Sequence, residues 1–256
     1  MQRPLISLLA ILTVATVVSA DPRPFAFTYD AYPEGKGNWE YEQYVTWRTH
    51  TREDSDFNRI DFRHAFEFGL ADNFDLEIYV PSWFYEDSTA GHRTRFDTAG
   101  VEGIVYLSNP VTDFIGLGIY NEVNLGEHEL EIEQKLLVHK DLGNWTLAYN
   151  LILETEIEGV FTSNADADVE VEGVLGHSFG ASYSVGHGNL RVGAEAIVES
   201  VYENWSHYED TTVYAGPAIS YSDGKHWWVT VTPVFQLTSV DDEADFNMRM
   251  IFGIEF

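Results

Sequence analysis

Apolar and polar side chains alternate strictly along the last residues of the chain. From Phe246 to Phe256 every second residue is Phe, Met or Ile, whereas the positions between them are mainly polar, such as Asn247, Arg249 and Glu255. A period of two over this length predicts a β-strand with one apolar and one polar face. The apolar face of such a strand lies either in the core of a soluble sandwich or against the lipid around a membrane barrel.

The same alternation recurs along most of the chain. It predicts an all-β fold, a transmembrane antiparallel up-and-down β-barrel of about twelve strands, with two fewer or two more as the alternatives. The third predicted strand places Phe84 on its apolar face together with Ile78 and Val80. Pro217 and Pro233 fall inside later strands, where each should remove a ladder hydrogen bond. The apolar stretches span residues 39–47, 60–70, 74–84, 101–107, 115–119, 130–138, 145–157, 175–185, 190–202, 213–221, 227–237 and 246–256.

Short and long connections alternate between the predicted strands without exception. Residues 71–73 and 140–144 read as tight turns, whereas 49–58, 85–97 and 159–168 are long and polar. Outer-membrane barrels have this layout, with short turns on the periplasmic side and longer loops outside. A soluble sandwich has no reason to sort its connections in this way, so the pattern favours the membrane barrel.

The N-terminus predicts export. A short basic start is followed by an almost wholly apolar run from Pro4 to Val18 and by the small residues Ser19 and Ala20. Residues 1–20 are therefore expected to be a signal peptide, cleaved before Asp21. An uncleaved anchor helix is the alternative, but the run is shorter than the roughly 20 apolar residues that span a bilayer.

The rest of the chain, residues 21–256, is expected to form one barrel domain. Its first part, residues 21–36, holds three prolines and a glycine and predicts an irregular lead-in before the first strand. No later segment approaches a membrane helix, and the mean hydropathy is −0.19. A membrane location therefore requires a closed barrel, because unpaired backbone groups cannot face lipid.

The composition of the chain argues against some classes of binding partner. The formal net charge is −28, which argues against nucleic acid and anionic lipid headgroups. Such acidity is also typical of disorder, but an aromatic content of 14% speaks against it here. The chain has no cysteine, and a barrel closed by its hydrogen-bond ladder needs no disulfide.

Carboxylates dominate the polar faces of the predicted strands. Burying so many unpaired charges in a dry core would be prohibitive, so we expect a hydrated lumen that prefers cations. The alternative is that Arg59, Arg63, Arg191 and Arg249 pair with carboxylates and close the bore. The acidic lumen positions are Asp61, Glu67, Asp75, Glu77, Glu102, Glu129, Glu131, Glu133, Glu154, Glu156, Glu170, Glu172, Glu195, Glu199 and Glu255, and the basic ones are Arg59, Arg63, Lys135, Arg191 and Arg249.

Two motifs raise the question of catalysis or metal binding. Residues 176–180 match the G-x-S-x-G pattern, but that motif needs a strand-to-helix turn, and His177 and Ser178 face opposite sides of a strand. Residues 127–133 place alternate Glu side chains about 6.5–7 Å apart along a strand, too far for one cation to bind all of them. The acidic stretches 164–168 and 241–245 lack EF-hand spacing. We therefore predict no enzyme, no cofactor and no metal.

Two other function classes stay open. A barrel lipase would need a second histidine near Ser178 from a neighbouring strand. A structural or adhesive surface barrel would use its acidic loops to bind cations. The tryptophans are expected in girdles at the membrane interfaces rather than at ligand sites, and these are Trp39, Trp47, Trp83, Trp145, Trp205, Trp227 and Trp228.

Two stretches carry a resemblance to known proteins. The final strand resembles the terminal strand of bacterial outer-membrane barrels, which typically finishes in Phe, and this implies that Phe256 is an assembly signal read by the barrel-assembly machinery. The hairpin 65–81 resembles the outer-membrane family named after the meta-cleavage pathway of phenol degradation. That likeness implies a barrel in the bacterial outer membrane that acts as a transporter. Together with the predicted lumen, we interpret the chain as a passive channel or small-solute transporter, in contact with outer-membrane lipid and with small solutes or cations.

Overall fold

The protein is an all-β barrel. The computed structural model describes residues 23–161, 169–186 and 188–256, so the expected signal peptide and the acidic stretch 164–168 lie outside it. Within these ranges no helix is long and apolar enough to cross a membrane. The strands are β1 (Trp39–Thr49), β2 (Asn58–Ala71), β3 (Phe74–Ser88), β4 (Gly91–Phe96), β5 (Ala99–Ser108), β6 (Gly116–Leu125), β7 (Glu129–Leu142), β8 (Trp145–Glu158), β9 (Glu170–Val185), β10 (Leu190–Glu203), β11 (His207–Ser222), β12 (Trp227–Gln236) and β13 (Phe246–Glu255).

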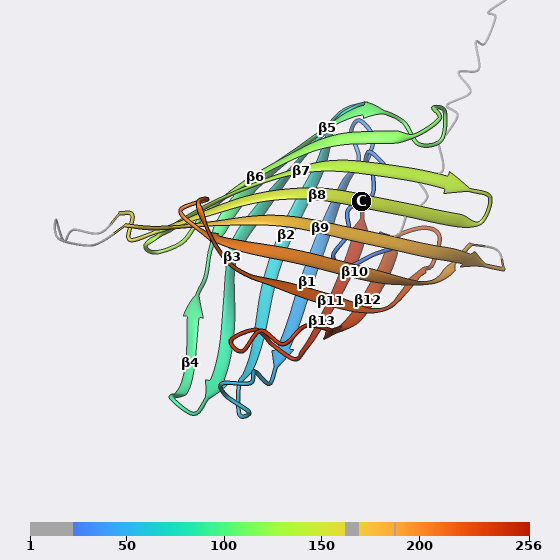
Figure 1. Ribbon diagram of the computed structural model, residues 1–256. Helices are drawn as coiled ribbons and strands as arrows, with labels where there is room; N and C mark the ends of the chain where they lie inside the picture. Colours follow the sequence, from blue (N-terminus) through green and yellow to red (C-terminus); the bar gives the residue numbers. More distant parts are fainter. Residues whose placement is uncertain (1–22, 162–168, 187) are drawn as a thin grey trace, which may run out of the picture.

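The sheet closes on itself. Each barrel strand is antiparallel to its neighbours in sequence, β1 pairs with β13, and β2 pairs with β3 (Figure 1). The short strand β4 pairs only with β3 and extends that hairpin beyond the ring, so twelve of the described strands form the barrel. The predicted fold class is confirmed. The predicted polar loop at 85–97 is wrong in part, because cross-strand pairs from Trp83–Phe96 to Ser88–Gly91 make most of it a hairpin.

The outer wall is apolar between two aromatic zones. Side chains such as Ile78, Val123 and Phe179 are exposed on it. At the end where the chain terminates, Trp39 stacks on Phe256 with ring centroids 4.0 Å apart. Further aromatic pairs at this end are Trp145–Tyr183 and Trp227–Phe252. At the opposite end they are Phe62–Trp83, Trp47–Phe246 and Tyr202–Trp205. Aromatic pairs at both rims are the girdles typical of membrane barrels.

One tryptophan departs from the girdle prediction. Trp228 is buried inside the barrel, where its indole N–H lies 2.9 Å from both carboxylate oxygens of Glu40. Its neighbour Trp227 is on the outer wall, as the alternation requires. The prediction for Trp228 is therefore wrong, because adjacent residues of a strand point to opposite faces.

The connections do not alternate in length without exception. On the side of the long loops, β6 and β7 are joined by residues 126–128 alone, and β10 and β11 by 204–206. On the opposite side, residues 109–115 form a longer connection than the other turns there. On the side of the long loops, the strands therefore continue further into the polar stretches of the sequence than was predicted.

A β-bulge in β3 reverses the phase of the strand. Phe62 opposes Trp83 and His64 opposes Val80, so two residues of β3, Pro81 and Ser82, face one residue of β2. Beyond the bulge, Phe84 points inward, is 6% exposed, and lies 3.8 Å from the guanidinium carbon of Arg59. The prediction that Phe84 faces lipid is wrong, since strict alternation cannot register an inserted residue.

The two strand prolines fall at one gap in the ladder. Pairing between β11 and β12 stops at Ala215–Phe235 and resumes at Ile219–Val231. Pro217 of β11 and Pro233 of β12 both lie within this gap. On their other sides the two prolines stay within the ladders, where Pro217 opposes Ala194 of β10 and Pro233 opposes Met248 of β13.

The lead-in lies inside the barrel. Residues 23–38 contain no helix or long strand segment and run through the lumen, where the blue N-terminal trace is seen behind the wall in Figure 1. Phe25 is 0% exposed and packs with Ala148 and Ala218 of the wall. The lumen is therefore occupied by the chain's own N-terminal segment.

Candidate functional site

A single carboxylate holds the start of the lead-in. Glu195 of β10 accepts the backbone N–H groups of Ala26, Phe27 and Thr28 at 2.7, 2.9 and 2.8 Å. It also accepts the hydroxyl of Thr232 at 2.6 Å. Hydrogen bonds to an ionised carboxylate are among the stronger ones in proteins, so Glu195 anchors the segment rather than standing open to solutes.

The wall holds the next residues of the lead-in through its own polar side chains. Asn150 accepts the N–H of Tyr29 at 2.7 Å and donates to the carbonyl of Tyr29 at 2.9 Å. Further along, Asp75 accepts the N–H of Glu34 at 2.8 Å. The irregular segment therefore satisfies its backbone groups on wall side chains, as buried backbone must.

Two wall glycines make room for the lead-in. A Cβ on Gly180 would lie 2.7 Å from the ring of Phe25, and one on Gly69 would lie 1.9 Å from the carbonyl oxygen of Gly35. Neither space tolerates a side chain without displacement of the segment. Glycine at these two positions lets the segment pack directly on the barrel backbone.

Cavities lie on either side of the lead-in. A cavity of about 430 Å³ opens towards the loop side, and one of about 70 Å³ lies towards the chain termini. Tyr29 lines both of them. The larger cavity is mostly acidic, with Asp61, Asp97, Glu122, Glu129, Glu131, Glu133, Glu154, Glu199 and Glu243 against Arg48, Arg63, Lys135 and Arg249.

Directly opposed glutamates connect the two cavities. Each barrel strand from β13 through β1, β2, β3, β5, β6 and β7 to β8 contributes one glutamate, and each is the cross-strand partner of the next. Like charges directly opposite each other destabilise a sheet, so this arrangement has a cost that the fold accepts. We name this set the glutamate belt, and it consists of Glu255, Glu40, Glu67, Glu77, Glu102, Glu122, Glu133 and Glu154.

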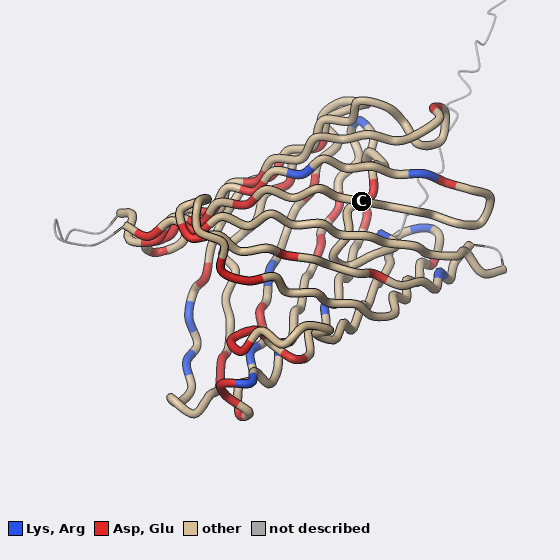
Figure 2. The backbone as a smooth tube through the Cα atoms, in the orientation of Figure 1, with Lys and Arg blue, Asp and Glu red and all other residues tan. Residues whose placement is uncertain are grey.

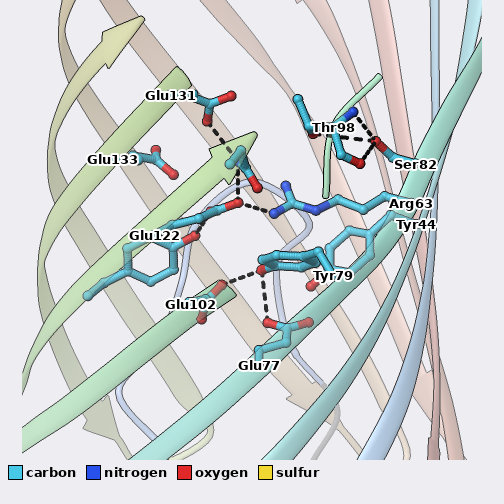
Figure 3. Close-up of polar contacts among 12 residues, drawn as sticks. Tyr44, Arg63, Glu77, Tyr79, Ser82, Thr98, Glu102, Glu122, Glu131 and Glu133 are labelled. Atoms are coloured by element: carbon cyan, nitrogen blue, oxygen red, sulfur yellow. Dashed lines mark hydrogen bonds and ion pairs between the residues drawn. The ribbon is translucent and has the colours of Figure 1, made fainter. Parts of the chain in front are cut away.

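Basic side chains and a tyrosine hydroxyl compensate part of the negative charge of the glutamate belt. Arg63 pairs with Glu122, and Lys135 pairs with Glu133 at 2.8 Å. Figure 3 shows the hydroxyl of Tyr79 between two belt members, where it donates to Glu102 and lies 2.9 Å from a carboxylate oxygen of Glu77. These contacts occupy some carboxylate oxygens and leave others facing the cavities.

The acidic residues predicted for the lumen, and three of the basic ones, lie in different parts of the barrel. Asp75 and Glu195 hold the lead-in, and Glu255 is buried next to Glu40. Glu156, Glu170 and Glu172 lie at the outer ends of β8 and β9, where acidic residues crowd in Figure 2. Lining the small cavity are Glu67, Glu77 and Glu102, and lining the large one are Asp61, Glu129, Glu131, Glu133, Glu154, Glu199, Arg63, Lys135 and Arg249.

The basic residues do not close the bore by pairing with carboxylates alone. Arg59 contacts Asp61 at 2.7 Å, and Arg63 pairs with Glu122. In contrast, Arg191 donates to the hydroxyl of Thr146 at 2.9 Å, and Arg249 donates to the hydroxyl of Thr46 at 3.1 Å. Within the described ranges the lead-in lies across the lumen, and its residue Tyr29 lines the cavities on both sides of it.

Sequence reasoning missed several residues of this site. Glu122 lies beyond the predicted apolar stretch 115–119, although β6 continues to Leu125. Glu40 and Glu42 alternate with Trp39 and Tyr41 and carried the same signal as the residues chosen. Arg23 and Tyr29 of the lead-in had no periodic signal by which they would be found.

Ser178 is not arranged as a nucleophile. Its hydroxyl donates to Asn150 at 3.1 Å, inside the barrel. His177 faces outward and contacts the hydroxyl of Tyr149 at 2.9 Å. Among the described residues no histidine is bonded to Ser178, so the contact required by the lipase alternative is not formed there.

One acidic trio comes close enough to hold an ion. Carboxylate oxygens of Glu131, Glu133 and Glu154 lie within 4.8 Å of one another. Glu131 and Glu133 are alternate positions of β7, within the stretch 127–133, and Glu154 joins them from the neighbouring strand β8, where it opposes Glu133. Lys135 already neutralises one of the three carboxylates.

A family model described as a family of unknown function, DUF6662, matches residues 17–249. The chain belongs to this family. The matching family does not carry the name of the meta-cleavage pathway, so that finer resemblance stays a prediction. No curated protein matches the chain.

Solved structures of outer-membrane proteins share the fold. The COG4313 outer membrane channel from Pseudomonas putida F1 is 14% identical with a TM-score of 0.64, and the match covers 89% of this chain and 98% of that one. A NanC porin is 8% identical with a TM-score of 0.57, over 84% and 98% of the two chains. The β domain of the Bordetella autotransporter BrkA is 14% identical with a TM-score of 0.51, over 85% and 98%.

Fold and wall chemistry agree on the location. The closed barrel, its apolar outer surface and its aromatic rims are those of bacterial outer-membrane barrels. The predicted outer-membrane location of this protein is thereby confirmed.

Proposed function

We propose that this barrel is a channel or transporter for small solutes that prefers cations, and that the lead-in closes its lumen. The observation that carries the proposal is the glutamate belt, which runs along the wall past the lead-in. Glu77 and Glu102 line the small cavity, and Glu122 and Glu133 line the large one. A cation moving along this wall meets a carboxylate on each successive strand.

The electrostatics of the lumen support cations over anions. A cleft lined by one sign of charge concentrates ions of the opposite sign, and carboxylate rings do this in cation channels. Aromatic faces add to it, since Arg63 and Lys135 already lie 3.3 and 4.2 Å from the ring centroids of Tyr79 and Tyr120. The large cavity, at about 430 Å³, is in the range that holds small molecules.

Reversal potentials in planar bilayers test the proposal. The purified barrel is measured in a KCl gradient, both intact and with Glu195→Ala to release the lead-in. We expect cation preference that declines as salt screens the wall over a Debye length of about 8–10 Å. Replacing Glu129, Glu131 and Glu133 together with Gln should reduce the preference.

The control removes the same charge from exposed positions. Asp56→Asn, Glu127→Gln and Asp241→Asn change residues on the outer loops, and the preference should stay close to that of the parent. Anion preference would contradict the proposal. So would the absence of conductance from both the intact and the released barrel, once each is shown to be folded.

A further inference from the structure

A pair of amide side chains lies in the middle of the apolar outer wall. The outward-facing side chains of β6 and β7 form five cross-strand pairs, and the central one joins Asn121 to Gln134. The side-chain N–H of Gln134 donates to the amide oxygen of Asn121 at 3.0 Å, and both side chains are exposed. The other four pairs are all aliphatic, and they are Leu117–Val138, Ile119–Leu136, Val123–Ile132 and Leu125–Leu130. The two amides therefore lie within the surface that faces hydrocarbon.

The bond between the two amides leaves part of each unused. Within the described part of the chain, it is the one hydrogen bond that either side chain makes. The side-chain N–H groups of Asn121 and the amide oxygen of Gln134 are left over. Lipid tails offer no hydrogen bonds, and a polar group left unpaired in hydrocarbon costs free energy. The pair therefore calls for a partner that supplies one acceptor and one donor at the same depth in the membrane.

Another amide on the outer wall is paired within its own barrel. Gln43 of β1 donates to the backbone carbonyls of Tyr44 and Arg63 at 2.9 and 3.0 Å, and its amide oxygen accepts the hydroxyl of Tyr41 at 3.2 Å. An outward amide of this barrel can thus be satisfied without a second protein. The pair on β6 and β7 differs from Gln43 because it keeps a donor and an acceptor in reserve.

We propose that a second copy of this chain docks on β6 and β7 and forms a symmetric dimer in the membrane. Two copies inserted in the same orientation are related by a two-fold axis along the membrane normal, and such an interface brings the same patch of both copies together. This rotation places β6 of one copy opposite β7 of the other. Asn121 of each copy then donates to Gln134 of the other, which pairs the groups left over in both.

The surroundings of the amides suit such a contact. Facing sheets pack about 10 Å apart, a distance that an Asn and a Gln side chain span with one hydrogen bond between them. On either side of the amides, Ile119, Val123, Ile132 and Leu136 are 37–39% exposed and free to pack on a facing wall. Lipid tails are as apolar as these side chains, so packing alone does not favour protein over lipid. The hydrogen bonds between the amides are what select this face.

Sedimentation equilibrium in a neutrally buoyant detergent measures the dimer. The folded mature barrel should show a reversible equilibrium between monomer and dimer, and Gln134→Leu should raise the dissociation constant at least tenfold. Gln43→Leu is the matched control, because it removes the same amide from the same outer wall, and it should dimerise as the parent does. Heat-modifiable migration of each variant confirms that it is folded.

Cysteine cross-linking tests the symmetry and leaves both amides in place. The chain has no cysteine, so barrels with Val123→Cys and barrels with Ile132→Cys are produced together in one outer membrane and oxidised. Because the two-fold axis places β6 opposite β7, the mixture should give several times more covalent dimer than either variant alone. Val123→Cys mixed with Val192→Cys, which changes an exposed residue of β10, should give only the background.

Three results would overturn the dimer. They are a folded parent that stays monomeric at every concentration, no greater weakening by Gln134→Leu than by Gln43→Leu, and cross-linking of Val123→Cys to Val192→Cys as strong as to Ile132→Cys. None of these measurements depends on conduction, so the dimer and the proposed channel stand or fall separately.

Discussion

Glu102 of β5 and Glu122 of β6 are direct cross-strand partners, yet they line different cavities of the lumen. The first accepts a hydrogen bond from Tyr79 on the small-cavity side, and the second pairs with Arg63 on the large-cavity side (Figure 3). The pair is thus where the glutamate belt passes the lead-in. Tyr29, whose hydroxyl lies 3.3 Å from Glu102, is the lead-in residue at this crossing.

Releasing the anchor should open the lumen. Glu195→Ala removes the acceptor of three backbone N–H groups, and each hydrogen bond to a charged group contributes about 1.5–3 kcal/mol. We expect larger single-channel conductance in planar bilayers. Glu199→Ala is the control, because Glu199 is on the same strand and lines the large cavity without holding the lead-in. Equal conductance of the two variants would show that the lead-in does not limit flow.

Filling the space at Gly180 should expel Phe25. The chain has no cysteine, so Thr28→Cys places a single thiol in the lead-in at a position that is 1% exposed, and it keeps the ring of Phe25. In this background, Gly180→Leu should make the thiol react with a water-soluble maleimide several times faster. Ala181→Leu adds the same side chain on the outer face and should change nothing. Fast labelling without any substitution at Gly180 would mean that the segment is not held in the lumen.

Arginine on the lipid face should cost more than arginine on the lumen face. Leu151 alternates with Ile152, which is buried and lines the large cavity. Leu151→Arg should lower the free energy of unfolding by roughly 2–4 kcal/mol if the residue lies near the midplane. Ile152→Arg reaches the hydrated, acidic cavity and should cost less. Guanidinium unfolding in lipid vesicles measures both, and equal losses would contradict the assigned faces.

Loss of the last aromatic residue should impair assembly. Phe256 stacks on Trp39, and its N–H donates to the carbonyl of Trp39 at 3.1 Å. We expect Phe256→Asp to reduce the folded, heat-modifiable barrel in outer-membrane fractions. Trp39→Leu removes the stack but keeps the terminal Phe. If both variants lose the same amount of folded barrel, the stack explains the effect and no assembly signal is needed.

Sequence periodicity was enough to predict which face of the wall most side chains lie on. Water and lipid lie on opposite sides of a barrel strand, so the side-chain period of two decides which residues face each. Leu151 and Ile152, and the acidic positions from Asp61 to Glu199, were assigned to their faces on this basis alone. The prediction failed for Phe84, because one extra residue at Pro81–Ser82 reverses the phase of β3.

Alternation by itself determined the fold class, and it predicted the facing of most strands and an acidic lumen. It did not determine the offset between neighbouring strands, because that depends on turn lengths and on the stagger that closes the barrel. Only this register brings Glu77, Glu102 and Glu122 opposite one another in the belt. The tertiary structure likewise decided the place of the lead-in, since Ala26 and Glu195 meet across 169 positions of the chain and no local pattern encodes a contact of that range.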